Sequence, residues 1–403
     1  MSGASGLRPE LFPVTRGCPF LPPAEYTRIR EEEPIAKVRL AEGKWAWAIT
    51  RHEDVRAVLV DPRFSSDRDN PDYPRLVPGG QSGSAAEKTL TSMDAPEHGV
   101  ARRAVLGEFT VRRMEALRPR VQAIVDERID AVLAGPKPVD LVRELSLPVP
   151  SLVICEVLGV PYGDHELFEG HTSTMVSTLS APEERQNAVK AIFAYLDGLV
   201  SLKEESPDDE DLLGRQIISG RAEGTYRHDA LVAMAFLLLA AGHETTANMI
   251  SLGVVALLEN PDQLARVQAD QAKTPSAVEE LLRYFTVVDS HIARVAVEDV
   301  ELGGVTIRAG EGVLGLLLAA NRDPEAFENP DGFDVERGAR HHVAFGFGPH
   351  QCLGQNLARM ELGIVIDTLF RRIPGLALAK PVEELEFKDK GVIYGLHTLP
   401  ITW

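Results

Sequence analysis

The sequence predicts a mainly α-helical protein with a small β-strand portion, folded as a single domain over residues 1–403. Apolar residues recur with the 3.6-residue period of amphipathic helices through most of residues 110–260. Short alternating segments with glycine turns are confined to residues 37–50 and 293–324. No internal repeat and no long glycine- or serine-rich linker divides the chain, so one domain is the simplest organisation.

The N-terminal part begins with a proline-rich segment over residues 1–30. A hairpin with a Glu-Gly turn is expected over residues 37–50, and a short helix over 52–64. Residues 65–93 contain many glycine, proline and serine residues and predict a long loop. Because loops of this length inside a compact protein are usually functional, we expect residues 65–93 to form the roof of a substrate pocket.

Helices are expected to follow this loop. Asp94 and Glu97 have the spacing of a capping box, with Pro96 in the first turn of the helix that they would open. His98 and Arg102 lie four residues apart and share one face of that helix. Helical periodicity then predicts helices over residues 111–135, 151–160, 186–205, 228–259, 276–285 and 353–373.

The composition argues against nucleic acids and membranes as partners. With 42 Lys and Arg against 60 Asp and Glu, the net charge is -18, so no global basic field exists to hold nucleic acid. The longest apolar run, residues 231–242, is shorter than the ~18 residues that span a bilayer. Cys18, Cys155 and Cys352 form no disulfide or zinc pattern, and the N-terminus has no signal-peptide segment. We therefore expect a cytoplasmic protein.

The predicted helix over residues 228–259 contains a local conflict. Residues 242–246, Gly-His-Glu-Thr-Thr, follow directly on its apolar run. Glycine costs ~1 kcal/mol relative to alanine inside a helix, and a threonine hydroxyl can bond the carbonyl one turn back and bend the axis. Two interpretations remain open: a polar patch where helices cross, or a bulged groove in which Glu244 and Thr245 handle protons beside a bound small molecule.

The segment FGFGPHQCLG at residues 345–354 predicts a tight loop that ends where a helix begins. Gly346, Gly348 and Pro349 make this loop tight and sterically open. A helix N-terminus favours a thiolate, which is the form of cysteine that binds metal ions. Because a merely buried cysteine would not need two glycines and a proline before it, we interpret Cys352 as a metal ligand.

A third motif is the pair Glu280 and Arg283, three residues apart on one helix face. Taken alone, this spacing is that of an ordinary exposed ion pair, worth ~0.2–0.5 kcal/mol. The pair lies between the two other motifs along the chain, and this order is informative.

In this order, the motifs resemble those of the cytochromes P-450. FGFGPHQCLG is similar to the cysteine-ligand loop of that family, AGHETT at residues 241–246 to its oxygen-binding helix, and ELLR at residues 280–283 to its ExxR pair. PDGFDVER resembles the family's meander, and EHGVARR and HIAR resemble its haem-propionate segments. The resemblance spans residues 30–403. It is greatest for the soluble bacterial, actinobacterial branch that hydroxylates macrolides, statins, steroids and vitamin D.

The resemblance implies a cytochrome P-450 fold around haem b, with Cys352 as the proximal ligand of the iron. It implies four hydrogen-bonding or cationic partners for the haem carboxylates: His98, Arg102, Arg294 and His350. It also implies a structural network that consists of Glu280, Arg283 and Arg337.

The activity implied by the resemblance is that of a haem-thiolate monooxygenase. Such an enzyme activates O₂ with two electrons and two protons and hydroxylates a C–H bond of a medium-to-large apolar molecule, such as a secondary metabolite, macrolide, statin or steroid-like compound. Glu244 and Thr245 would deliver the protons. The apolar residues that precede Thr245 at intervals of four, or follow the ExxR pair, are pocket candidates and are equally ordinary in a core: Leu237, Ala241, Val287, Val288 and Ile292.

The resemblance also implies electron partners, because the haem motifs occupy the whole chain and leave no flavin or iron–sulfur domain. Electrons would come from a ferredoxin and its NAD(P)H-dependent ferredoxin reductase. Any single arginine is commonly an ordinary solvated charge, but the clustering of basic residues close to the haem motifs favours a docking patch for that ferredoxin: Arg102, Arg103, Arg112, Arg113, Arg340, His341 and His342.

Three alternatives remain open. A peroxide-driven haem-thiolate oxygenase would not need the pair Glu244 and Thr245. A haem sensor or other non-catalytic haem-binding protein would bind the cofactor without turning over a substrate. A zinc protein would draw its ligands from one short segment, although the spacing fits no closed zinc site: His341, His342, His350 and Cys352.

Overall fold

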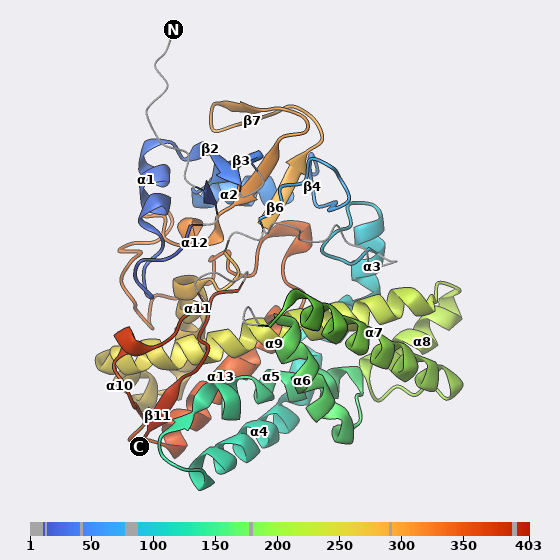
Figure 1. Ribbon diagram of the computed structural model, residues 1–403, viewed down its shortest axis with the longest axis vertical. Helices are drawn as coiled ribbons and strands as arrows, with labels where there is room; N and C mark the ends of the chain where they lie inside the picture. Colours follow the sequence, from blue (N-terminus) through green and yellow to red (C-terminus); the bar gives the residue numbers. More distant parts are fainter. Residues whose placement is uncertain are drawn as a thin grey trace.

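The computed structural model describes residues 11–12, 14–40, 43–76, 88–176, 180–289, 292–388 and 393–403. Most helices gather around one long helix, and most strands lie at the other end of the molecule, on the side of the N-terminus (Figure 1). The described helices are α1 (Ala24–Glu32), α2 (His52–Val60), α3 (Glu97–Leu106), α4 (Val111–Ala134), α5 (Pro148–Leu158), α6 (His165–Val176), α7 (Pro182–Glu205), α8 (Leu212–Glu223), α9 (His228–Glu259), α10 (Pro261–Ala269), α11 (Thr274–Phe285), α12 (Leu317–Ala320) and α13 (Gln355–Arg372). The predicted fold class, mainly helical with a small β portion, is confirmed.

The described strands form three small sheets. The largest has the order β1 (Leu11–Phe12), β2 (Ile35–Leu40), β3 (Trp45–Ile49), β9 (Gly312–Gly315), β6 (Ile292–Ala296) and β4 (Phe64–Ser65). A second sheet has the order β10 (Ala377–Leu378), β11 (Pro400–Thr402) and β5 (Val139–Asp140), and a third pairs β7 (Val300–Leu302) with β8 (Val305–Ile307). The hairpin expected over residues 37–50 is the antiparallel pair of β2 and β3.

The largest sheet supplies one wall of the site. Its strand β6 runs antiparallel to β9, with Arg294 opposite Val313. Because successive side chains of a strand point to opposite faces, Ile292 and Arg294 share one face of the sheet. Both residues line the cavity between the sheet and the helices.

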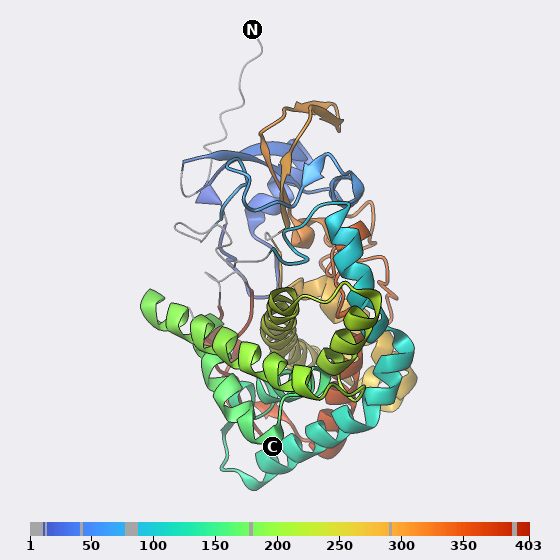
Figure 2. The same ribbon diagram turned by 90° about the vertical axis from the view of Figure 1, so that its right-hand side faces the viewer.

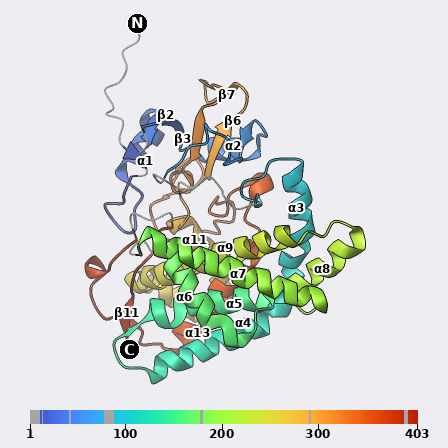
Figure 3. The ribbon, with the colours of Figure 1, turned by 45° about the vertical axis from the view of Figure 1, so that its right-hand side comes forward.

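Helix α9 is the core of the helical part. It packs against α5, α7, α11 and α13. Figure 2 shows it nearly end-on among the other helices, and Figure 3 shows α7 lying across it. Among the described residues, α9 is the one helix long and apolar enough to cross a membrane. Its second half is buried almost throughout against neighbouring helices, so its apolar composition is that of a core helix.

The bulge considered at residues 242–246 is absent, because α9 continues as an α-helix through them. Gly242 lies against Ile154 of α5, whose side chain would be 3.6 Å from a Cβ at position 242. A Cβ there would make an ordinary van der Waals contact, so the packing of α5 on α9 leaves room for a larger residue at this position. The Thr245 hydroxyl donates to the carbonyl oxygen of Ala241 at 2.7 Å, which satisfies it without a break in the helix.

The capping box predicted for α3 is wrong. No side chain caps this helix, and its first residue is Glu97. The Asp94 carboxylate instead accepts hydrogen bonds from the Ser66 N–H, at 2.7 Å, and from the Ser65 hydroxyl. Asp94 therefore ties the start of α3 to the end of β4. The Ser66 hydroxyl in turn lies 3.2 Å from Nε2 of His350, so this contact also positions a predicted site residue.

The segment expected as strands over residues 293–324 contains a helix as well. Residues 317–320 form the short helix α12. Its first two N–H groups donate to Asp289, that of Leu317 to the backbone oxygen and that of Leu318 to the carboxylate. This capping from a distant residue has no local sequence signal, which explains the difference.

Candidate active site

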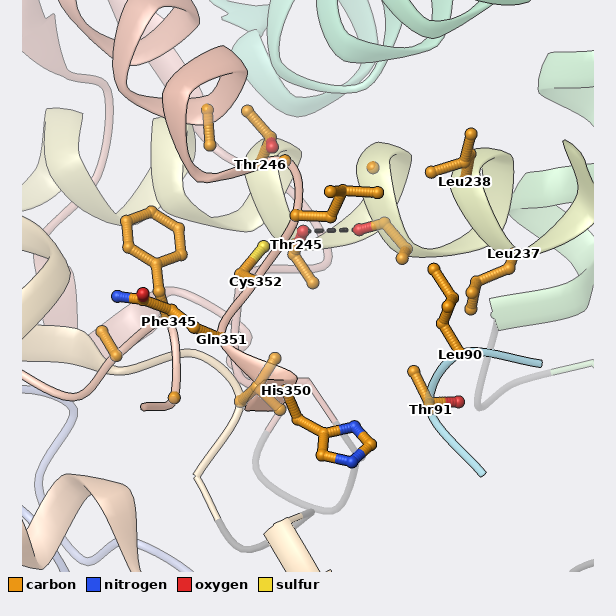
Figure 4. Close-up of a pocket in the computed structure, with 18 of the residues that line it drawn as sticks. Leu90, Thr91, Leu237, Leu238, Thr245, Thr246, Phe345, His350, Gln351 and Cys352 are labelled. Carbon is orange, nitrogen blue, oxygen red and sulfur yellow. Dashed lines mark hydrogen bonds between the residues drawn. The ribbon is translucent and has the colours of Figure 1, made fainter. Parts of the chain in front are cut away.

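A cavity of about 370 Å³ lies between α9 and the loop of residues 345–354. Apolar side chains make up most of its wall. Figure 4 shows Cys352 below α9, with its sulfur pointing toward the helix face that carries Thr245. Leu90 and Leu237 gather toward the other end of the cavity (Figure 4). The cavity is large enough for a bound small molecule.

The cysteine loop needs its glycines. Gly346 and Gly348 have φ of +68° and +71°, a conformation that strains other residues. A Cβ on Gly348 would also lie 2.9 Å from the backbone oxygen of Leu59. The Cys352 N–H donates to the Phe345 oxygen at 2.8 Å and closes the loop. The two glycines therefore place the Cys352 sulfur at the wall of the cavity.

The charge state of Cys352 differs from the expectation based on the helix N-terminus. Burial raises the pKa of the Cys352 thiol, and the Gly354 N–H and the cation of Arg102 only partly oppose this effect. The protein groups alone therefore favour the thiol. A coordinated metal ion deprotonates a thiol outright, so a metal ion bound to Cys352 would itself supply the charge that stabilises the thiolate.

Four predicted site residues meet at one end of the cavity, which all of them line: His98, Arg102, Arg294 and His350. The rings of His98 and His350 stack with centroids 3.9 Å apart. Burial lowers the pKa of both imidazoles, that of His350 to about 4, with further lowering by nearby cations such as Arg294. Both rings are therefore neutral near pH 7.

The same four residues fit the two carboxylates of a haem. Nε2 of His98 is buried without a hydrogen-bond partner in the described part of the chain. Arg294 is 6% exposed, and within the described part of the chain its guanidinium donates only to the oxygen of Ala293, its own neighbour. Arg102 lies close by and donates to the Gln351 oxygen at 2.6 Å. Among the described residues, neither cation has a carboxylate partner, which is costly for partly buried charges, and a dianionic group beside them would remove that cost.

The polar residues of α9 divide between two sides of the helix. Thr245 and Thr246 line the cavity, whereas Glu244 and His243 are buried and do not. Oε1 of Glu244 accepts hydrogen bonds from Nζ of Lys388 at 2.6 Å and from Asn248. The predicted acid, Glu244, and the predicted alcohol, Thr245, are neighbours in sequence. The structure places their side chains on different sides of α9.

The five predicted pocket residues all line the cavity: Leu237, Ala241, Val287, Val288 and Ile292. One lining residue that sequence reasoning missed is Glu361 of α13, which is 2% exposed. Burial raises the pKa of its carboxyl to about 8, which favours the neutral acid near pH 7. Its signal in the sequence was a lone glutamate in the apolar stretch MELGIVI.

The structure also brings Glu280, Arg283 and Arg337 together. Arg283 donates to both carboxylate oxygens of Glu280 at 2.7 Å, and both side chains are 0% exposed. Arg337 Nε donates to the same carboxylate at 3.2 Å. Arg283 further donates to backbone oxygens of the loop after α12, at Asn321, Pro330 and Gly332. The interpretation as an ordinary exposed pair is therefore wrong.

The residues of the zinc alternative do not converge. Nε2 of His341 lies 3.0 Å from the Ala326 oxygen, and Nε2 of His342 lies 3.1 Å from the Glu279 carboxylate. His350 faces Ser66 instead. Within the described residues, no group of three His, Cys, Asp or Glu side chains is placed to hold a metal ion. Cys352 is thus suited to be a single protein ligand to a metal that a cofactor brings.

Comparisons with known proteins agree with this geometry. The sequence model of the cytochrome P450 family matches residues 24–374. Cytochrome P450-SU2 of Streptomyces griseolus is 48% identical over 387 residues, covering 96% of this chain and 95% of that protein. The vitamin D3 dihydroxylase of the same organism is 44% identical over 393 residues, covering 97% and 96%. The crystal structure of cytochrome P450 MoxA from Nonomuraea recticatena superposes with a TM-score of 0.94 and 58% identity, covering 98% of this chain and 99% of that one.

An apolar cavity between a cysteine loop and the face of α9 that carries Thr245 is the arrangement expected of a haem-thiolate enzyme. The comparisons show that this chain belongs to the cytochrome P450 family. It is a bacterial-type P450 monooxygenase whose cofactor is haem b and which hydroxylates apolar small molecules with electrons from redox partners. The predicted family, enzyme class, reaction and cofactor are thereby confirmed.

Proposed function

We propose that this monooxygenase works in the cytoplasm with a ferredoxin and an NAD(P)H-dependent ferredoxin reductase, and that Cys352 ligates its haem iron. In this proposal, Glu244 and Thr245 deliver the protons. One observation carries it: Cys352 and Thr245 line the same apolar cavity, from the loop of residues 345–354 and from α9. A ligand and a proton donor that face each other across an apolar cavity are what oxygen activation on a haem requires.

The substrate that this cavity favours is a medium-to-large apolar molecule of the secondary-metabolite, macrolide, statin or steroid-like class. Most of the cavity wall is apolar, as for Leu237 and Val287. The name of the similar vitamin D3 dihydroxylase supports the steroid-like class. A spin-shift titration of the holoenzyme against a panel of macrolides, statins and steroids tests this assignment, and a panel without any spin shift would contradict it.

We also propose that residues 65–93 form the roof of this pocket, within a single domain over residues 1–403. Residues 77–87 lie outside the described part of the chain. On either side of them, four residues of the same segment line the cavity: Arg68, Tyr73, Leu90 and Thr91. The Tyr73 hydroxyl donates to the Ala293 oxygen at 3.1 Å, which supports an attachment of this segment to β6.

The residues of the site have separate tasks in this proposal. When bound, the haem supplies the oxidation chemistry of the reaction. Arg102 and Arg294 pair with its carboxylates and thereby orient it, and the neutral rings of His98 and His350 donate hydrogen bonds to the same groups. Thr245 holds a hydroxyl proton at the cavity wall through its bond to the Ala241 oxygen. Exchange of that bond for one to a water or oxygen in the cavity presents the proton where it is needed.

Thr245→Ala is expected to keep haem and substrate binding but to lower the yield of product per NADPH consumed by about tenfold, because a positioned proton donor contributes at least this much. The measurement is the ratio of hydroxylated product to NADPH in the reconstituted system. Thr245→Ser, which keeps the hydroxyl, is the control and should retain most of the yield. An unchanged ratio in Thr245→Ala would remove Thr245 from the mechanism and leave the neighbouring Thr246, which also lines the cavity.

Two of the seven residues predicted for the docking patch do not belong to it. His342 is buried against Glu279, and Arg102 lines the cavity, so neither side chain belongs to a surface for a protein partner. The remaining members are exposed and define the docking patch used below: Arg103, Arg112, Arg113, Arg340 and His341. Exposed apolar side chains of Val100 and Val111 lie on the same helices, α3 and α4. A mixed basic and apolar surface supports binding of an acidic ferredoxin.

Arg112→Glu combined with Arg113→Glu is expected to slow ferredoxin-dependent reduction about tenfold at low salt and to flatten its salt dependence, because surface charges are screened over ~10 Å at 0.1 M salt. Reduction by dithionite and substrate binding should stay unchanged. The control variant, Lys137→Glu with Arg143→Glu, carries the same change of charge. Both of its residues follow the C-terminal end of α4, a helix of 24 residues that is ~36 Å long. A wild-type rate and salt response in the first variant would place the docking site elsewhere.

A further inference from the structure

The ring of Phe345 carries a cation on one of its faces. Phe345 lines the cavity, and its backbone oxygen accepts the N–H of Cys352 at 2.8 Å. The guanidinium of Arg359, on α13, lies over this ring at 4.6 Å from the ring centroid. Arg359 itself is not part of the cavity wall, although its neighbour Ala358 is. A positive charge is therefore held against the cysteine loop, behind an aromatic ring of the cavity wall.

Contacts with three side chains fix this guanidinium and the ring. Nε and Nη2 of Arg359 donate to the two carboxylate oxygens of Glu279 at 2.6 and 3.1 Å, and Nη1 donates to Oε1 of Gln355 at 2.9 Å. Nε2 of His342 lies 3.1 Å from the Glu279 carboxylate, and the His342 ring lies 5.8 Å from that of Phe345, between centroids. The bidentate pair holds the planar guanidinium in one orientation.

Both charges of this pair are present near pH 7. Burial by itself raises the pKa of the Glu279 carboxyl, but hydrogen bonds from His342 and Arg359 outweigh burial and lower it to about 2. A guanidinium stays protonated in proteins. The cation is the charge of the pair that lies against the Phe345 ring. Because a protein interior screens charges less than water does, a cation in this position acts on a charge that develops in the cavity.

We propose that Arg359, held by Glu279, is a positioning residue for the haem: it fixes the Phe345 ring beside the cysteine ligand and keeps a positive charge there, which raises the reduction potential of the bound haem. The inference rests on the proposed ligation of the haem iron by Cys352. Reduction adds one electron, and thus one negative charge, in the cavity. A cation close by stabilises the added charge, and the surroundings of the sulfur ligand are one of the means by which a protein sets a potential.

The test is a spectroelectrochemical titration of the holoenzyme with dithionite and mediator dyes, which needs no protein partner. Arg359→Met should lower the equilibrium constant of the one-electron reduction by about tenfold, or about 59 mV, which is the effect of one charge ~10 Å away in a protein interior. Arg359→Lys keeps the charge and should restore most of the potential. Glu279→Gln should act in the opposite direction and raise the constant about threefold, because it removes the anion and leaves Arg359 on Gln355.

Arg372→Met is the matched control. Arg372 also lies on α13, ~20 Å further along the helix, and pairs with Asp130. Its side chain is 24% exposed, close to the 28% of Arg359. Loss of this pair should lower stability in a comparable way but leave the potential unchanged. An equal fall of the potential in both variants would show a general effect of lost cations and overturn the inference.

The red-shifted Soret band of the reduced carbon monoxide complex separates the inference from the proposed function. Absence of the band from the wild-type protein would overturn ligation by Cys352 and the inference with it. With the band present, an unchanged potential in Arg359→Met overturns the role of Arg359 alone. Slower reduction by ferredoxin at an unchanged potential has the same meaning, since it would make Arg359 a docking residue. If Arg359→Met loses the haem or the band, Glu279→Gln decides, and an unchanged or lower potential in that variant overturns the inference.

Discussion

Cys352→Ser is expected to abolish the red-shifted Soret band of the reduced carbon monoxide complex. The band reports a thiolate bound to the haem iron, and a serine oxygen does not donate electron density to the iron as a thiolate does. The loop itself should persist, since the backbone bond from residue 352 to the Phe345 oxygen does not involve the side chain. The measurement is the difference spectrum of the dithionite-reduced protein with and without carbon monoxide.

Cys18→Ser and Cys155→Ser are the controls, and each should retain the band. Cys155 is buried in the helical core, on α5, and Cys18 lies in the N-terminal segment. Neither residue lines the cavity. Persistence of the band in Cys352→Ser would show that the assigned ligand is wrong.

The parts of the fold that depend on local sequence were predictable. The hairpin of β2 and β3 follows from alternation around a Glu-Gly turn, and α9 follows from its apolar composition. The cysteine loop was predictable for the same reason, because a left-handed backbone at Gly346 and Gly348 can be inferred from the residue type itself. In each case, the physical cause lies within about ten residues of the feature.

The parts that depend on distant contacts were not predictable. Asp94 had a plausible local partner in Glu97, yet its carboxylate binds Ser66, 28 residues away. The ion pair of Lys388 with Glu244 joins residues 144 positions apart, and nothing in the segment around Lys388 indicates a partner. Hydrogen bonds and ion pairs between residues so far apart in sequence form only when whole helices and strands pack together. The spacing of residues along the chain does not predict that packing.

Burial was the other quantity that the local sequence did not reveal. His342 was grouped with surface charges because it follows Arg340 and His341, but it is buried against Glu279. The family resemblance indicated a network around Glu280 where spacing alone indicated an exposed pair. An i,i+3 ion pair has a different effect on stability when it is buried than when it is exposed. This difference can be measured as a free energy of unfolding.

Glu280→Gln is expected to lower the free energy of unfolding of the holoenzyme by about 3–5 kcal/mol, because it leaves the buried guanidinium of Arg283 without a counter-ion. Such a loss is a large share of the ~5–15 kcal/mol that keeps a typical protein folded. It should also reduce the haem content of the purified protein, since Arg283 ties α11 to the loop after α12. The measurement is denaturant unfolding followed through the Soret band and far-UV circular dichroism.

Glu115→Gln is the matched control, because the chain contains the same pair in an exposed setting. Arg118 donates to both oxygens of Glu115 at 2.7 and 2.8 Å, again at i,i+3, but these side chains are 47% and 54% exposed. Water stabilises each charge when the other is removed, so the expected loss is at most ~0.5 kcal/mol. Equal losses in the two variants would mean that burial adds nothing to the Glu280 pair. A much larger loss in Glu280→Gln would show that the same geometry becomes structural only when solvent is excluded from it.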